Sequence, residues 1–380
     1  MANIGRITRR EYLVRPVVGA ANVAYPRAIM RTKVLGIGSY VPDRIVTNDE
    51  IPFLNDQHVV QAVKQTETDD AWIQKRTGIK TRRYVPNDGS TATSDLAVAA
   101  SKRAIDDAGI PATDIDCIIL GTLSPDFHFP GTAVVIQKKL GIADKTNCAC
   151  FDIRQQCSAF VYGLQMADAF IWTGIYKRVL LIGAELHSHS LDYTTRGRDT
   201  MVLFGDGAGA MVLGPMESDD PKSGVMYTSV HADGNGVNDL NLKIYEIQRM
   251  PYLDYDPRDR ERNALMYPHM DGKRVFLNAV RGMVMSTQTA LVKTGLGWDD
   301  IDWFVPHQAN LRINEKVVEV AKIPADKVLN TIEFFGNTTA ATVPLTIDYW
   351  LRDGRVRKGQ RVLSSVFGSG FTWGAAIFQI

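Results

Sequence analysis

Three side chains that could act together in catalysis, Cys157, His307 and Asn337, each follow a strand-like segment of the chain. Cys157 opens an apolar run with helical periodicity, where unpaired N–H groups and the helix dipole are expected to lower the pKa of the thiol and make it nucleophilic. His307 and Asn337 would add two neutral hydrogen-bond donors, and such a set needs no neighbouring carboxylate.

This combination suits a decarboxylative condensation through an acyl-cysteine intermediate. When a malonyl thioester loses carbon dioxide, negative charge collects on the thioester oxygen, and two donors directed at that oxygen stabilise the enolate without protonating its carbon. Each residue alone also has a structural interpretation: a buried inert thiol, a structural or solvated histidine, or a turn asparagine. The combination of the three favours the catalytic hypothesis.

Two glycine-rich segments have different predicted roles. The segment FGSGF, residues 367–371, is suited to bring backbone N–H groups close to a ligand, because glycine lacks the Cβ that would block the approach. The segment FGDG, residues 204–207, is interpreted as a tight structural turn, because the Gly-Lys-Ser/Thr ending of a phosphate-binding loop is missing. Nucleotide hydrolysis is therefore not expected.

The elements that must position these residues alternate between helical and strand-like patterns, as in α/β proteins. A helix Ser94–Ala108 is predicted to stop at a glycine and to be followed by a buried strand, Asp116–Leu120. The second half repeats this order, with a helix from about Leu277 to Lys293, a glycine stop and a strand Ile301–Val305.

The two halves also correspond in their letters. DIDCIIL matches DIDWFVP, and LGIADKTNCACFDIRQQCSA matches AKIPADKVLNTIEFFGNTTA, while KRVLLIGAE matches GQRVLSSVF and GAGAMVL matches GAAIFQI. Any two α/β halves share a hydrophobic pattern, but four ordered correspondences favour an internal duplication. Two copies packed about a pseudo-twofold axis bring equivalent turns together, so Cys157 and Asn337 are expected to share a site.

The composition argues against several function classes. With 380 residues, of which 45% are hydrophobic, the chain can bury two domains or one fused pair, and its formal net charge of +1 gives no field for nucleic acid. No apolar run reaches the roughly 18 residues of a membrane span, so a cytoplasmic location without membrane insertion is expected. Cys148 and Cys150 lack a second pair at zinc-finger spacing, so no metal is expected.

The chain is expected to have three parts. Residues 1–32 are rich in arginine and fit a flexible arm or upstream start, a structured extension or a targeting peptide, and we expect an extension without a catalytic role. Residues 33–217 form the half that carries the nucleophilic cysteine. Residues 218–380 form the half that carries His307 and Asn337, with an insertion near 242–263.

Four motifs resemble the β-ketoacyl-acyl-carrier-protein synthase III family of the thiolase superfamily: CSAF, VPHQANLRI, FGNTTAATVP and FGSGFTWGA. The resemblance runs from about Lys33 to the C-terminus. It implies a thiolase-like five-layer αβαβα fold built from two duplicated halves, and a homodimer. It also implies an acyltransferase that condenses an acyl-CoA primer with a malonyl thioester, on an acyl carrier protein, in fatty-acid initiation. Both thioesters are substrates, and no cofactor is implied.

The resemblance also implies a role for each matching position. Cys157 would be the acylated nucleophile, His307 and Asn337 the decarboxylation donors, and the backbone amides of Cys157 and Ser369 the oxyanion hole. The other implied contacts are Trp72 and Arg76 at the coenzyme A mouth, Arg198 on the adenine, Asn310 on the pantetheine, Arg312 on an acidic carrier protein, and Phe129 closing the acyl pocket of the partner subunit.

Three departures from the family pattern bear on this assignment. Gln155 and Gln156 precede the nucleophile where the family often has small residues, which would alter the acyl tunnel. Ser369 replaces the middle glycine of the family's triplet, so its backbone dihedrals matter. The stretch Leu242–Asn263 is longer than usual and could be a cap over the entrance or a surface loop.

Other functions compete with this one. A synthase III-like enzyme of secondary metabolism could use the same three residues with another acyl donor or acceptor. An acyl transferase or thioesterase would use Cys157 and His307 without decarboxylation, and a non-catalytic acyl-binding protein would need neither. Phe129 disfavours olefin-pathway condensing enzymes, which have a glutamate there, and Asn337 disfavours hydroxymethylglutaryl synthases. Primer length stays open.

Overall fold

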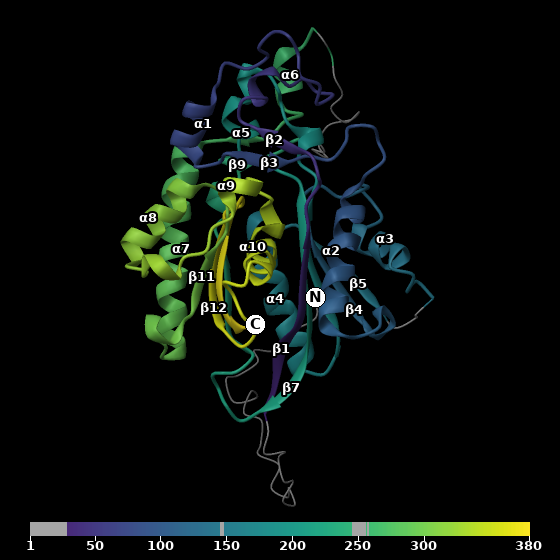
Figure 1. Ribbon diagram of the computed structural model, residues 1–380, viewed down its shortest axis with the longest axis vertical. Coiled ribbons are helices and arrows are strands. Elements are labelled where there is room, and N and C mark those ends of the chain that lie inside the picture. Colours follow the sequence, from purple (N-terminus) through teal and green to yellow (C-terminus); the bar gives the residue numbers. More distant parts are fainter. Residues whose placement is uncertain (1–28, 145–147, 245–255, 257) are drawn as a thin grey trace, which may run out of the picture.

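Two sheets form the frame of the protein in the computed structural model, which describes residues 29–144, 148–244, 256 and 258–380 (Figure 1). The first sheet has the order β1 (Ile29–Tyr40), β7 (Gly207–Ser218), β6 (Val179–Glu185), β4 (Cys117–Gly121) and β5 (Ala149–Ile153). The second has the order β11 (Trp303–Pro306), β12 (Arg361–Gly368), β13 (Thr372–Gln379) and β8 (Val225–Ala232).

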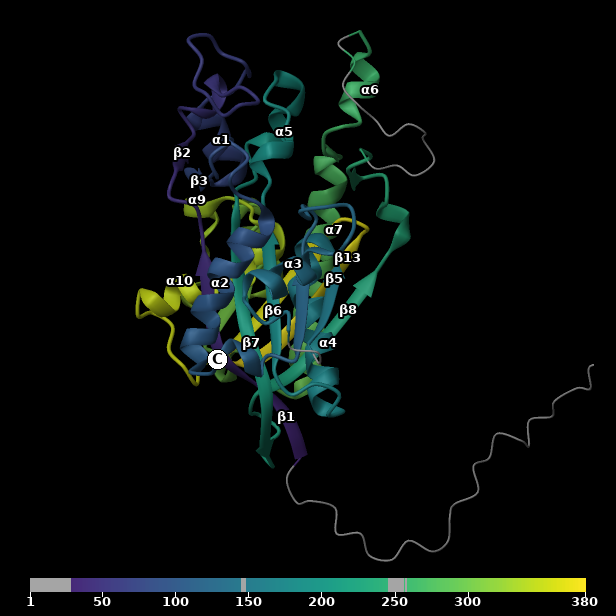
Figure 2. The same cartoon turned by 90° about the vertical axis from the view of Figure 1, so that its right-hand side faces the viewer.

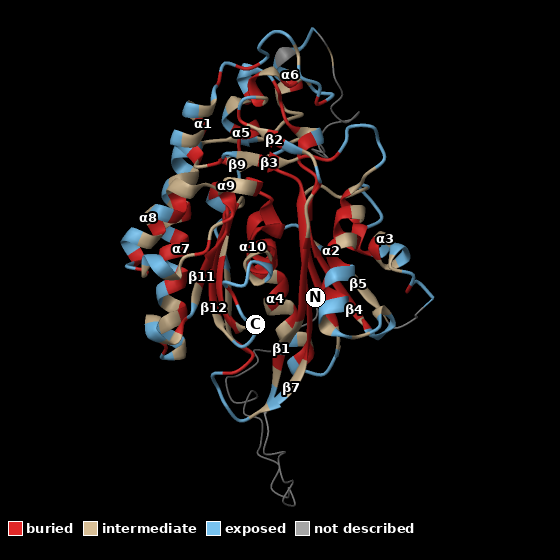
Figure 3. Ribbon diagram, in the orientation of Figure 1, coloured by how far each residue is buried: buried red, intermediate tan, exposed pale blue. Residues whose placement is uncertain are grey.

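Helices cover both sheets and fill the space between them, which gives the predicted five layers. On the outer faces lie α2 (Thr93–Ala108) and α3 (Thr132–Lys139) on the first sheet, and α7 (Gly272–Thr294) and α8 (Leu311–Ala321) on the side of the second. Between the sheets lie α4 (Ala159–Trp172) and α10 (Thr342–Arg352). Half of the residues of α4 and most of those of α10 are buried, because each helix faces protein on both sides (Figure 3).

The two sheets have matching topologies. In the first, β1, β7 and β6 pair antiparallel and β6 pairs parallel with β4; in the second, β8, β13 and β12 pair antiparallel and β12 pairs parallel with β11. The counterpart of β5 in the second half is a single parallel bridge between Phe304 and Val328. This agrees with an internal duplication. The predicted division between residues 217 and 218 lies at the end of β7 and stays a prediction.

The predicted helices and strands of both halves are present, with small shifts at their ends. The glycine stops hold the expected left-handed conformation, with φ 65° at Gly109 and 66° at Gly295. Glycine is also required where β1 meets α2, because a Cβ on Gly36 would lie 2.3 Å from the Ala104 carbonyl oxygen. The close approach of this strand and helix therefore depends on a missing side chain.

Shorter elements gather at one end of the molecule (Figures 1 and 2). They are β2 (Ile45–Thr47), β3 (Thr81–Arg83), α1 (Asp70–Thr77), α5 (Arg198–Met201), β9 (Leu240–Asn241), α6 (Arg260–Ala264), β10 (His269–Met270) and α9 (Ile332–Phe335). Most of the predicted extension (residues 1–28) and part of the predicted insertion (residues 245–255 and 257) lie outside the described residues. No helix in the described part is both long and apolar enough to span a bilayer.

Candidate active site

Cys157 lies in a short 3-10 turn, Gln156–Ser158, that joins β5 to α4, close to the predicted helix start. Gln156 holds a left-handed φ of 43°, and the Ser158 hydroxyl donates to Gln155 O at 2.7 Å. Cys157 as a whole residue is only 9% exposed. Burial, together with the negative charge of Glu185, raises its pKa to about 12. The predicted lowering of this pKa is therefore wrong, because desolvation outweighs the turn's N–H groups.

His307 follows β11 and is 1% exposed. Its Nδ1 lies 2.7 Å from the Thr342 hydroxyl, while its Nε2 is buried with no hydrogen-bond partner. The Thr342 hydroxyl proton has two acceptors within reach, His307 Nδ1 and the Thr339 carbonyl oxygen at 3.0 Å, and its donation to Nδ1 leaves the ring proton on Nε2. Burial lowers the pKa of His307 to about 3. The ring is therefore neutral, and in the tautomer that accepts the Thr342 proton at Nδ1 its Nε2–H can donate to a ligand.

Asn337 is held by its backbone and by one side-chain oxygen. Its N–H donates to Leu203 O at 2.8 Å, and its carbonyl accepts from Gly205 N at 3.1 Å. The Oδ1 atom accepts from Thr339 N at 2.8 Å. Because an N–H group must face an oxygen, this contact fixes the amide orientation and leaves the Nδ2 protons for a ligand.

The three side chains line one cavity of about 680 Å³. The sequence places them at residues 157, 307 and 337, and the duplicated fold brings the ends of β5 and β11 and the turn after α9 to the same place. Gly368, at the end of β12, lines the cavity beside them. The structure therefore brings together the predicted nucleophile and both predicted donors, while their catalytic roles stay predictions.

A second cavity of about 360 Å³ reaches Cys157 from another direction. Cys157, Phe204 and Leu240 line both cavities, so the thiol lies where they meet. The wall of the second cavity also includes Gln156, one of the two glutamines that depart from the family pattern. The remaining described residues that line it are Leu123, Arg154, His187, Ser190, Asn241, Leu242, Lys243, Pro268, Thr339 and Ser369.

The glycine-rich segment lies against the nucleophile's backbone. A Cβ on Gly368 would lie 3.1 Å from the Cys157 nitrogen and 3.2 Å from the Ser158 nitrogen, so the bare glycine allows the close approach. The positive φ of this segment, 132°, belongs to Gly370, and Ser369 is not left-handed. A serine in place of the family's middle glycine is therefore accommodated without backbone strain.

Two arginines lie beside Trp72, Arg76 from the predicted coenzyme A mouth and Arg198 from the predicted adenine contact, and these binding roles stay predictions. The guanidinium carbons of Arg76 and Arg198 lie 4.5 and 4.7 Å from the centre of the Trp72 ring. Trp72, Arg76 and Asn310 line the first cavity. Asn310 also caps α8, where its Oδ1 accepts from Arg312 N at 2.8 Å. A flat base could stack on this tryptophan between cationic groups.

Arg312 and Phe129 lie outside both cavities, and their predicted roles stay predictions. Arg312 donates to the backbone of α1, at Gln74 O and Lys75 O, and forms an ion pair with Glu315 at 2.9 Å. Its guanidinium thus holds α8 against α1. Phe129 is 82% exposed in the loop before α3.

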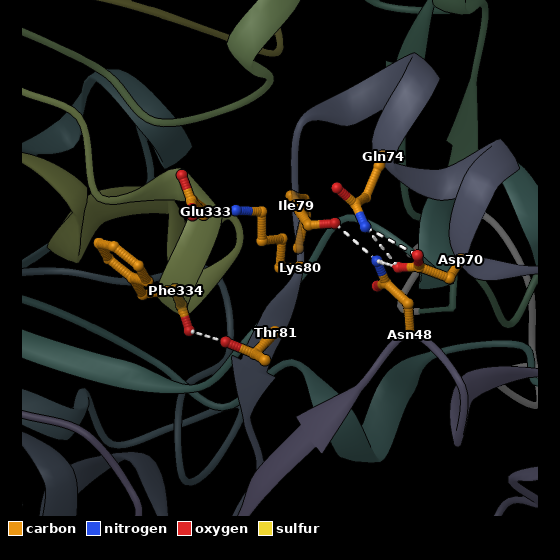
Figure 4. Close-up of polar contacts among 8 residues, drawn as sticks. All are labelled: Asn48, Asp70, Gln74, Ile79, Lys80, Thr81, Glu333 and Phe334. Atoms are coloured by element: carbon orange, nitrogen blue, oxygen red, sulfur yellow. Dashed lines mark hydrogen bonds and ion pairs between the residues drawn. The ribbon is translucent and has the colours of Figure 1, made fainter.

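A polar network fixes the segment that leads to Asn337 (Figure 4). Lys80 forms an ion pair with Glu333 of α9 at 2.6 Å, and the Thr81 hydroxyl donates to Phe334 O at 2.9 Å. The chain leaves α9 and reaches Asn337 two residues after its end. The strand β3 therefore holds the turn that presents the carboxamide.

The same network reaches the tryptophan mouth through Asn48 (Figure 4). Asn48 Nδ2 donates to Ile79 O at 2.7 Å and to the Asp70 carboxylate at 2.8 Å, and Gln74 donates to both oxygens of that carboxylate. Asp70 begins α1, the helix that carries Trp72. The mouth and the Asn337 turn are consequently tied to one another.

Sequence reasoning missed four polar residues around the site: Glu185, His187 and Thr339 near the thiol, and Thr342 at His307. Burial raises the pKa of Glu185 to about 7, although its carboxylate accepts hydrogen bonds from the Leu123–Ser124 segment. Thr339 and Thr342 belong to the motif FGNTTAATVP, but their contacts depend on the folded turn. The available signal was the position of Glu185 at the end of a strand, two residues before His187.

A fold of two duplicated α/β halves with a cysteine, a histidine and an asparagine on one cavity defines a thiolase-fold acyltransferase. Models described as 3-oxoacyl-[acyl-carrier-protein] synthase III and its C-terminal part match residues 151–234 and 291–380. A beta-ketoacyl-[acyl-carrier-protein] synthase III from Hyphomonas neptunium is 40% identical over 351 residues, 92% of this chain and 99% of that protein. The chain belongs to the β-ketoacyl-acyl-carrier-protein synthase III family.

Solved structures give the same result. The 3-oxoacyl-[acyl-carrier-protein] synthase III from Aquifex aeolicus is 35% identical, with a TM-score of 0.78 over 92% of this chain and 100% of that one. The priming β-ketosynthase of the R1128 polyketide pathway is 32% identical, with a TM-score of 0.79 over 95% of this chain and 99% of that one. In the described residues, no group of three histidine, cysteine or acidic side chains could hold a metal ion.

Proposed function

We propose that this chain condenses an acyl-CoA primer with a malonyl thioester on an acyl carrier protein, the reaction that initiates fatty-acid synthesis. The observation that carries the proposal is the meeting of Cys157, His307 and Asn337 on one cavity that Trp72 also lines. The 40% identity to a synthase III over nearly the whole of both chains supports the same activity. Neither half-reaction requires a metal or an organic cofactor.

In the first half-reaction, the Cys157 sulfur attacks the thioester carbon of the acyl-CoA. A bond forms between sulfur and the acyl carbon, the bond to the coenzyme A sulfur breaks, and the thiol proton leaves with the coenzyme A thiol. The backbone amides of Cys157 and Ser369 are suited to bind the tetrahedral oxyanion, because Gly368 lets the two segments approach closely. The product is an acyl-cysteine.

In the second half-reaction, the malonyl thioester loses carbon dioxide, and its thioester oxygen accepts hydrogen bonds from His307 Nε2–H and Asn337 Nδ2–H. Both donors are neutral, so they stabilise the enolate without supplying a full positive charge or a readily lost proton. The enolate carbon then attacks the acyl-cysteine. This step forms the β-ketoacyl thioester and returns the cysteine sulfur.

A homodimer in the cytoplasm completes the proposal. The strand β5 lies at the edge of the first sheet and is only partly buried, and an unpaired edge is suited to a second copy of the chain. The nearby loop exposes Phe127 by 56% and Phe129 by 82%, as expected for rings that another subunit covers. Phe129 would close the acyl pocket of that subunit, and Arg312 would contact the carrier protein.

Two measurements on the purified chain test the proposal. Intact mass after incubation with acyl-CoAs should show one acyl adduct, absent in Cys157→Ser. Radiolabelled malonyl carrier protein should then release carbon dioxide and give a β-ketoacyl product only with the acylated enzyme. An adduct that is hydrolysed or transferred without release of carbon dioxide would instead establish a simple acyl transferase or thioesterase.

A further inference from the structure

A second histidine, His187, approaches the nucleophile from the second cavity. It follows β6 and is 3% exposed, and its backbone N–H donates to the buried Asp206 at 2.8 Å. Its ring packs on Phe204 with 4.6 Å between ring centres. Its Nε2 lies 2.5 Å from the hydroxyl of Thr339. This imidazole is therefore held in one orientation and directed at a single partner.

Thr339 links that histidine to the thiol. It is fully buried, it lines the second cavity together with Cys157 and His187, and its hydroxyl lowers the pKa of the Cys157 thiol. Its backbone holds a left-handed φ of 50°, which is rare for a β-branched residue. Such a conformation persists where the surrounding structure imposes it, and here it places the hydroxyl between the two groups.

The direction of each hydrogen bond in the series His187, Thr339, Cys157 follows from the number of protons that each group carries. The Thr339 hydroxyl has one proton, and a thiolate can only accept, so the proton must lie toward sulfur when Cys157 is ionised. The hydroxyl oxygen then accepts from His187 Nε2–H. Burial lowers the pKa of His187 to about 3, so its ring is neutral and supplies that single N–H.

The thiolate needs such donors because its surroundings oppose ionisation. Burial and the Glu185 carboxylate, from the end of β6, both raise the pKa of the Cys157 thiol, whereas the Thr339 hydrogen bond lowers it. Two neutral imidazoles also lie nearby, His307 in the first cavity and His187 in the second. The described residues with charged side chains that line these cavities are Arg76, Asp199 and Lys273 in the first and Arg154 and Lys243 in the second.

We propose that His187 is a positioning residue: it holds the Thr339 hydroxyl proton on the Cys157 sulfur and so stabilises the thiolate that attacks the acyl-CoA. The proposal rests on the function proposed above for the identity of the acyl donor. The stabilisation itself belongs to the free protein. It can be measured without any substrate.

Alkylation of the full-length chain by iodoacetamide, followed from neutral to alkaline pH, provides the test. Peptide mass separates Cys157 from the other three cysteines. In His187→Leu we expect the pH profile of Cys157 alkylation to move to higher pH, with about a tenfold lower rate at a fixed pH, the usual effect of one hydrogen bond to a charged group. His187→Gln, which keeps an N–H donor, should recover most of the rate.

Thr339 provides an independent pair of variants. Thr339→Val removes the hydroxyl and should give the same displacement of the profile, whereas Thr339→Ser keeps the hydroxyl and should stay near the unsubstituted protein. A folded His187→Leu chain with an unchanged profile would overturn the proposal, as would a Thr339→Ser profile equal to that of Thr339→Val. Loss of acylation by acyl-CoA with the alkylation shifts intact would instead count against the proposed function alone.

Discussion

Replacement of Asn337 by aspartate separates the role of the carboxamide in chemistry from its role in the fold. The two side chains have nearly the same shape, and the Oδ1 atom of an aspartate could still accept the Thr339 N–H now 2.8 Å away. The backbone bonds to Leu203 and Gly205 do not involve the side chain. The substitution therefore changes one atom group, the NH₂ that faces the cavity, into an oxygen.

The expected loss follows from the charge that develops on the substrate. Removal of one donor from a site that binds a developing oxyanion costs about 100- to 1,000-fold in rate, or roughly 2.7–4 kcal/mol. Asn337→Ala should show a loss of this size. Asn337→Asp should lose more than Asn337→Ala, because it adds a negative charge next to the enolate oxygen at a position that is only 4% exposed.

The assay compares two rates in the same preparation. Formation of acyl-Cys157 from acyl-CoA, read by intact mass, should stay within a few-fold of the unsubstituted protein, because Asn337 does not act in that step. Release of labelled carbon dioxide from malonyl carrier protein should fall by the factors given above. If Asn337→Asp releases carbon dioxide within tenfold of the unsubstituted rate, the carboxamide is not a decarboxylation donor.

Three further changes test other parts of the site. Thr342→Val should slow carbon dioxide release about tenfold while Thr342→Ser retains the rate, because only a hydroxyl at this position can donate to His307 Nδ1. If the two variants release carbon dioxide at the same rate, the Thr342 hydroxyl does not donate its proton to Nδ1. Trp72→Ala should raise the KM for acyl-CoA about tenfold in steady-state assays with kcat kept, and an unchanged KM would remove Trp72 from the mouth. The folded-state pKa of Glu185, about 7, exceeds its unfolded value of 4.5, so this group's contribution to stability is present below pH 4.5 and is lost as pH rises through 7. In urea unfolding between these limits, Glu185→Gln should remove a fall of about 3 kcal/mol, and an unchanged fall would contradict the assignment.

The fold was largely predictable because its signals are local. The helix predicted at Ser94–Ala108 differs from α2 by one residue, since an apolar stripe and a terminal glycine define it. The helix predicted from about Leu277 begins five residues earlier, at Gly272. The first turn of α7 lines the first cavity, so it shows no stripe of residues that face a sheet, and its start is set by a cap from Asp271.

The site was predictable only where turns of the duplicated unit identified it. Cys157, His307 and Asn337 stand after strand-like segments, and such positions can be read from the chain. His187 and Thr339 touch only after the two halves pack together, 152 positions apart, so no spacing rule connects them. The sign of the Cys157 pKa shift was missed for a similar reason, because a sequence gives the helix start but not the burial around it.

Burial explains both why Cys157 is difficult to ionise and why the imidazoles near it are neutral. The burial that raises the pKa of the thiol also lowers the pKa of His307 and His187, so both imidazoles remain neutral donors. A charged imidazolium in the first cavity would protonate the enolate carbon and end the reaction. Hydrogen bonds from neutral groups are also stronger at such buried positions than in water. This chemistry therefore requires two uncharged histidines. One lines each of the two cavities that meet at the Cys157 sulfur.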